Sequence, residues 1–90
     1  MLKNLEELIQ VIRGRKKTPI DQSYTNKLLN DKKLSLSKVK EEISELIESV
    51  EKDTNKVHEA ADVIYHLLVY LEANNIKIED VLQELEKRKK

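Results

Sequence analysis

Four acidic residues form two pairs with the same spacing, Glu42 with Glu45 and Glu59 with Asp62. Helical residues three positions apart lie roughly 60° apart, so each pair would present its carboxylates on one side of a helix. Carboxylates held this close repel one another unless a cation lies between them, and ligand sets made only of oxygen suit Mg²⁺ or Mn²⁺. The first chemistry that the sequence suggests is therefore that of a divalent metal ion.

The first acidic pair has charged neighbours. Glu41 would lie about 40° from Glu45 around a helix, so it joins the same stripe at the border of the apolar face. Lys38 stands three positions before Glu41 and four before Glu42, where its charge can neutralise part of the stripe. Glutamate-rich helix faces are common and usually only solvated, so this pair alone is weak support for a metal.

The second pair lies in an apolar setting. From residue 60 to residue 71 the only residues that are neither apolar nor aromatic are Asp62 and His66. A helix that is apolar nearly all round must be buried, here in part by a second copy of the chain. Ionised carboxylates are costly to bury unless they are paired or bind a metal. The alternative is an Asp62–His66 pair inside the bundle with Glu59 at its solvent edge.

The elements that would position these residues are all helical. One glycine, one proline, no Phe or Trp and many Leu, Glu and Lys residues predict an all-α fold with a single domain over residues 1–90. The periodicity predicts a first helix that ends near Arg13 with a cap at Gly14, and a second from Gln22 to Asn30. A third helix is predicted from Ser35 or Ser37 to Lys52, and a fourth from an N-terminal cap at Thr54 to Asn74. The last predicted helix runs from Ile78 to Lys89. Thirteen residues separate Glu45 from Glu59, so an antiparallel hairpin would bring the two pairs face to face.

Composition excludes several classes. The 90 residues carry 17 basic and 17 acidic side chains, which argues against a nucleic-acid binder, and no stretch approaches the ~18 apolar residues of a membrane span. The lack of cysteine excludes a disulfide framework and a zinc–thiolate site, and it favours a cytoplasmic location. A chain this short buries only about 64% of its surface on folding, which favours a homodimer. Residues 1–33 are basic and the remainder is acidic, as if a basic arm covered an anionic ligand beside a metal.

At this point the residues resemble a known family. Glu42-x-x-Glu45 followed by Glu59-x-x-Asp62 resembles the metal-binding signature of the MazG-type all-α nucleoside triphosphate pyrophosphohydrolases. One branch, the phosphoribosyl-ATP pyrophosphohydrolases of histidine biosynthesis, is similar over nearly the whole chain. The segments that carry this similarity are Ser23 to Leu28, Lys38 to Glu45 and Glu59 to Val69.

The resemblance implies a MazG-like helical bundle completed by dimerisation. It also implies that Mg²⁺, with Mn²⁺ as a substitute, is held by Glu42, Glu45, Glu59 and Asp62, and that water attacks the α–β anhydride of phosphoribosyl-ATP. The products would be phosphoribosyl-AMP and pyrophosphate. Glu41 and Glu42 are both candidates for the general base.

The resemblance further assigns substrate contacts. The candidate substrate-binding residues are Arg15, Lys16, Lys17, Ser23, Tyr24, Lys27 and Lys38. His66 is expected beside the metal ligands, supporting them rather than binding the ion. Simpler interpretations are a solvated cationic end for residues 15–17, a helix start for Ser23, a core position for Tyr24 and a structural role for His66.

Two other functions use the same residues. A MazG-type hydrolase that cleans the nucleotide pool would keep the metal cage and act on ordinary or damaged deoxynucleoside triphosphates. A non-enzymatic helical module would bind a partner through its apolar faces and leave the acids solvated. Mg²⁺ would then leave its thermal stability unchanged.

Overall fold

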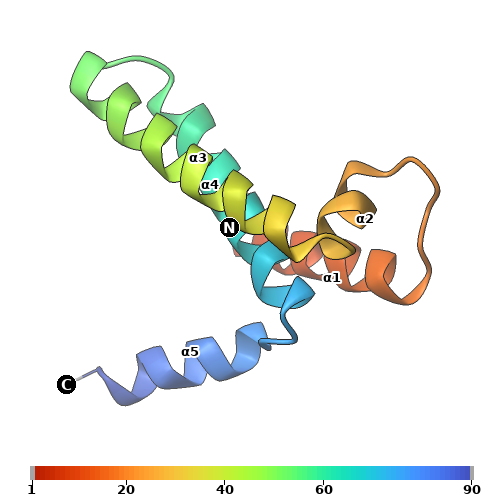
Figure 1. Ribbon diagram of the computed structural model, residues 1–90. Coiled ribbons are helices and arrows are strands. Elements are labelled where there is room, and N and C mark those ends of the chain that lie inside the picture. Colours follow the sequence, from red (N-terminus) through yellow and green to blue (C-terminus); the bar gives the residue numbers. More distant parts are fainter. Residues whose placement is uncertain (1, 90) are drawn as a thin grey trace.

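The computed structural model describes residues 2–89 and contains five helices joined by short connections (Figure 1). The helices are α1 (Lys3–Lys17), α2 (Tyr24–Leu29), α3 (Lys32–Lys52), α4 (Lys56–Ala73) and α5 (Ile78–Lys87). No strand occurs in that range, which confirms the all-α fold expected from the composition. No helix within it is long and apolar enough to cross a membrane.

The long hairpin of α3 and α4 dominates the molecule (Figure 1). Its first helix begins where the Asp31 carboxylate accepts a hydrogen bond from the backbone N–H of Leu34, at 3.0 Å. That helix ends at Asp53, whose left-handed backbone (φ 57°) directs its N–H back to the carbonyls of Ser49 and Val50. Asn55, also left-handed, completes the turn into α4. The hairpin is the antiparallel pair that the thirteen-residue spacing predicts.

Several predicted helix ends were wrong. Gly14 does not cap α1, which continues to Lys17, because one helical glycine costs only about 1 kcal/mol. The third helix begins at Lys32, earlier than either predicted serine, because Asp31 supplies a cap. Thr54 does not cap α4, which begins after Asn55 without a side-chain cap, and α5 ends at Lys87. The short helix α2 lies within its predicted range.

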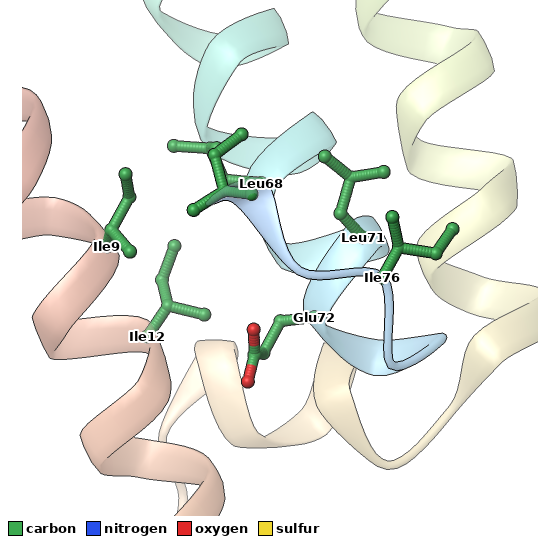
Figure 2. A pocket seen from close by; sticks show the side chains of 7 residues that line it. Ile9, Ile12, Leu68, Leu71, Glu72 and Ile76 are labelled. Carbon is green, nitrogen blue, oxygen red and sulfur yellow. The ribbon is translucent and has the colours of Figure 1, made fainter. Parts of the chain in front are cut away.

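The core lies where α1 and α2 cross the C-terminal half of α4. Its buried members are Ile12, Leu28, Leu29, Leu68, Val69 and Ala73. Figure 2 shows Ile9 and Ile12 of α1 facing Leu68 of α4, with Leu71 and Ile76 closing the far side. The cavity left between them measures about 10 Å³, close to the least that holds one water, so it is a packing gap and not a substrate pocket.

The N-terminal half of α4 is not buried within one chain. Val57 and Ile64 are 86% and 49% exposed, and Leu67, nearly one turn further on, is 42% exposed. The sequence predicted that a second copy of the chain would supply part of the burial of this helix. On α3, Ile43, Ile47 and Val50 are also exposed. Among the described elements, none packs against this far half of the hairpin (Figure 1). That a second copy of the chain covers it stays a prediction.

Candidate active site

The hairpin brings the two acidic pairs together. The carboxylates of Glu42 and Glu45, from α3, and of Glu59, from α4, have ligand atoms within 4.8 Å of one another. Asp62 follows one turn later on α4, with Glu59 and His58 in a second group of the same size. We call these four carboxylates the acidic cluster. Glu41 belongs to neither group, because its carboxylate pairs with Lys38 at 3.2 Å on the exposed side of α3.

The acidic cluster is partly removed from water. Glu42 is only 8% exposed, and Glu45, Glu59 and Asp62 are half-buried. One carboxylate oxygen of Glu42 and one of Glu59, Oε2 in each case, are fully buried and have no hydrogen-bond partner among residues 2–89. Buried acceptors without a partner cost free energy, and a cation is the group that would satisfy two of them together.

Electrostatics support the same interpretation. Burial raises the pKa of the Glu42 carboxyl, and its contacts with Glu45 and the charge of Asp62 raise this pKa further. Burial likewise raises the pKa of the Glu59 carboxyl, and the nearby carboxylates of Glu45 and Asp62 raise it further. These carboxylates therefore hold protons more readily than ordinary glutamates in the metal-free protein. Their oxygen-only donor set fits Mg²⁺ or Mn²⁺.

Sequence reasoning missed His58, which lies four positions before Asp62 in the first turn of α4. Its Nε2 lies 3.4 Å from Oδ2 of Asp62, and its ligand atoms group with those of Glu59 and Asp62. The signal was present in the sequence as a His–Asp pair at i,i+4.

His66 does not pair with the Asp62 carboxylate. Its Nδ1 lies 2.9 Å from the backbone carbonyl of Asp62 and its Nε2 lies 3.0 Å from the hydroxyl of Tyr24. A carbonyl only accepts, so Nδ1 carries the hydrogen, and Nε2 of the neutral ring accepts from the tyrosine O–H. His66 thus joins the acidic cluster to α2, beside the carboxylates rather than among them.

Residues Ser23, Tyr24 and Thr25, at the start of α2, lie on the side of the acidic cluster where His66 meets this helix. Ser23 caps α2 and also accepts a hydrogen bond from the guanidinium of Arg15, at 3.0 Å. Thr25 is bonded to the hydroxyl of Tyr65, and the rings of Tyr24 and Tyr65 stack with centroids 6.5 Å apart. Tyr24 remains 46% exposed. Burial raises the pKa of its hydroxyl and the nearby charge of Lys38 lowers it.

The predicted basic residues separate into two groups. Arg15 donates to the hydroxyl of Ser23, whereas Lys38 lies close enough to Tyr24 and Glu42 for its charge to act on both. Lys16 instead donates to the carbonyl of Glu72 (2.8 Å) and to Oδ1 of Asn75 (2.6 Å) at the far end of α4. Glu72 lies ten residues, about 15 Å of helix, beyond Asp62.

The other two predicted bases have no contact with the cluster in the described part of the chain. Lys17 lines a groove with Arg13, Glu72 and the start of α5. Lys27 is exposed on the last turn of α2. The structure thus places Lys38 beside the cluster and Arg15 at Ser23, and it leaves Lys16, Lys17 and Lys27 apart from the cluster.

Comparison with known proteins decides the family. The family model for phosphoribosyl-ATP pyrophosphohydrolase matches residues 5–89. The chain belongs to the phosphoribosyl-ATP pyrophosphohydrolase family. A phosphoribosyl-ATP pyrophosphatase of Clostridium acetobutylicum is 49% identical over 90 residues, which cover 93% of this chain and 79% of the relative.

Relatives from other lineages extend this result. A protein of the same name from Halobacterium salinarum is 42% identical over 91 residues and is covered to 96% of its length. The histidine biosynthesis bifunctional protein HisIE of Pyrococcus furiosus is 40% identical over 87 residues, and the chain spans 41% of it. Membership of this family confirms the resemblance seen in the sequence.

Proposed function

We propose that this chain is a phosphoribosyl-ATP pyrophosphohydrolase that uses Mg²⁺, or Mn²⁺ in its place, to form phosphoribosyl-AMP and pyrophosphate in histidine biosynthesis. The observation that carries the proposal is the pair of buried, unpaired carboxylate oxygens on Glu42 and Glu59 in a chain of this family. A structural cluster would pair these oxygens with donors. The lack of cysteine also fits a reducing cytoplasm, where we expect the enzyme to act.

The proposed roles follow from position. Glu42, Glu45, Glu59 and Asp62 would hold the ion, which when bound offsets phosphate charge and lowers the pKa of water. Glu42 lies inside the cluster and is assigned as a ligand. Glu41 lies outside it on the exposed side of α3, where its carboxylate pairs with Lys38 at 3.2 Å. Glu41 is therefore the general base that we assign, accepting the proton that the attacking water loses.

Substrate recognition is assigned to the side of α2. The ammonium of Lys38 supplies positive charge beside Tyr24, and the guanidinium of Arg15 supplies it at Ser23, the preceding residue. The phosphates of the substrate would lie beside these charges. The half-exposed Tyr24 ring offers a flat surface beside them. Because Lys16 is engaged at the far end of α4, we assign it to that helix end and not to the phosphates.

We also propose a homodimer. The exposed apolar residues of the far hairpin lie at helical spacing, which gives a continuous stripe on each helix. They are Ile43, Ile47 and Val50 on α3 and Val57, Ile64 and Leu67 on α4. Since the acidic cluster lies on the same hairpin, a second copy on this stripe would bring its own residues close to the site. Light scattering that shows a monomer at micromolar concentration would contradict this proposal.

The test of function is pyrophosphate release from phosphoribosyl-ATP, measured beside ATP and a panel of deoxynucleoside triphosphates, with and without Mg²⁺. Metal-dependent release from phosphoribosyl-ATP alone is the expected result. Release from deoxynucleotides would keep the metal site and change the substrate. Inactivity on every substrate would favour a binding module with solvated acids.

A further inference from the structure

His58 adds a nitrogen donor to one end of a cluster that otherwise offers only oxygen. It precedes Asp62 by four residues, so the two side chains lie on one face of α4, and His58 Nε2 stands 3.4 Å from Asp62 Oδ2. Two metal ligands at i,i+4 on one helix face are a spacing that can bind one ion directly. The Glu59 carboxylate lies within 4.8 Å of both ligand atoms.

The geometry of the pair fits coordination. Zn–N and Zn–O bonds are each about 2.1 Å long, and two such ligands 3.4 Å apart enclose an angle of about 108° at the ion, near the tetrahedral value. A longer separation would need a new side-chain conformation before one ion could bind both. The observed separation of these two atoms is compatible with both binding one ion.

A simple ion pair does not account for this arrangement. The side chains of His58 and Asp62 are 71% and 35% exposed, and such pairs contribute little to stability. The pair also leaves the buried Oε2 of Glu59, in the same group, without a partner in the described chain. At the inner end of the cluster, Glu42 is more than nine-tenths buried and its Oε2 is likewise unpaired among residues 2–89. Both oxygens point to a cation within the cluster.

We propose that His58, Glu59 and Asp62 together bind a divalent ion of borderline softness, such as Zn²⁺ or Co²⁺, through a ligand set that Mg²⁺ does not favour. Imidazole suits such ions, and affinity for nitrogen-containing sites rises from Mn²⁺ to Co²⁺ along the first-row series. The proposal rests on the proposed function because it uses the same acidic cluster. It adds that this protein discriminates among metal ions through His58.

The first test observes the imidazole nitrogens directly. The metal-free, ¹⁵N-labelled protein is titrated with Zn²⁺, and with Mg²⁺ in a separate sample, while the histidine ring nitrogens are followed by NMR. The chain contains only two histidines, and His66, whose Nε2 faces Tyr24, is the internal control. We expect Zn²⁺ to shift Nε2 of His58 strongly, Mg²⁺ to leave it in place, and His66 to change little with either ion.

The second test compares ligand replacements. His58→Asn removes the donor, and His58→Asp substitutes oxygen for nitrogen. We expect Co²⁺ affinity, measured by calorimetry and by visible absorption, to fall about tenfold or more in both variants. Mg²⁺ affinity should change little in His58→Asn and should not fall in His58→Asp. Thr54→Asn, an exposed change in the adjoining turn, should leave both affinities unaltered.

The outcomes separate this inference from the proposed function. Zn²⁺ or Co²⁺ binding with an unshifted His58 would overturn the inference, as would equal affinities in the wild type and His58→Asn. Metal-dependent hydrolysis of phosphoribosyl-ATP would still stand in either case. A protein that binds no divalent ion and hydrolyses nothing would overturn both.

Discussion

Replacing Glu42 with glutamine should stabilise the metal-free protein while removing its response to Mg²⁺. The Glu42 carboxylate is 8% exposed, its Oε2 is unpaired within the described chain, and acidic neighbours surround it. Glutamine keeps nearly the same size and carries no charge. Its amide can donate to Glu45 or Glu59, so a repulsive contact becomes a hydrogen bond.

The magnitude follows from the separation of the charges. Two carboxylates at most 4.8 Å apart repel by at least about 3.5 kcal/mol at an effective dielectric constant of ~20. Burial of the Glu42 carboxyl, its contact with Glu45 and this repulsion raise its pKa. We therefore expect a gain of about 2 kcal/mol, which raises Tm by about 10 °C in a domain of this size. Wild type should gain about 2.7 kcal/mol from Mg²⁺ at 100 times Kd, and Glu42→Gln should lose most of this gain.

The dependence on pH has a definite sign. Because the folded pKa of Glu42 lies above its unfolded value, the folded metal-free protein binds this proton more tightly than the unfolded chain does. Stability of the wild type should then decrease as pH rises from about 4.5 through the raised pKa, and Glu42→Gln should lack this contribution.

The assay is thermal and urea unfolding of metal-free protein at pH 5 and pH 7.5, at one fixed protein concentration. Glu48→Gln is the matched control, because Glu48 is an exposed glutamate on α3 that pairs with Lys52 and has a lowered pKa. It should bring no gain in stability and no loss of the Mg²⁺ response. A Glu42→Gln variant that is less stable than Glu48→Gln without metal would refute the reasoning.

Three further predictions concern other parts of the molecule. Glu45→Gln should abolish pyrophosphate release with unchanged far-UV circular dichroism, and near-normal turnover would contradict the proposed metal site. Ile64→Lys should give a monomer by light scattering, whereas Val11→Lys, an equally exposed change on α1, should leave the dimer intact. Arg13 holds the pKa of Glu79 at about 2, so the stability from this pair is present above pH ~4.5 and is lost as pH falls toward 2. Glu79→Gln should remove that part of the acid sensitivity in pH-dependent unfolding.

The periodicity of apolar residues predicted the hairpin, but it did not predict the residues at which its helices begin and end. The spacing of Glu42, Glu45, Glu59 and Asp62 required only that two helices pack antiparallel, which their apolar faces ensure. Where a helix begins depends on which of several nearby polar side chains caps its first turn. Asp31 accepts the N–H of Leu34 and moves the start of α3 to Lys32, and neither nearby serine provides that cap.

The positions of the acidic side chains were predictable and those of the basic side chains were not. Carboxylates on rigid helices keep their relative positions, so spacing alone brings them together. A lysine has a long, flexible side chain that binds whichever acceptor lies within reach. Lys16 donates to the carbonyl of Glu72 and caps α4, whereas Arg15, one residue earlier, points to Ser23. The run of three basic residues at positions 15–17 does not indicate which acceptor each side chain will bind.

Metal binding, dimerisation and stability should be coupled in this fold. The acidic cluster lies beside α2, and the apolar stripe continues from there along the far half of the α3–α4 hairpin, which no other described element covers (Figure 1). Without metal, the hairpin carries mutual repulsion among carboxylates and exposed Ile47 and Ile64 side chains. A bound cation would remove the repulsion among the carboxylates, and a second copy would bury the exposed apolar side chains. Each binding event should favour the other, because both hold α3 and α4 in the same register. Amide hydrogen exchange would detect the coupling, because Mg²⁺ should protect the first turns of α4 in the wild type and protect them less in Ile64→Lys. Equal protection in both proteins would show that the two events are independent.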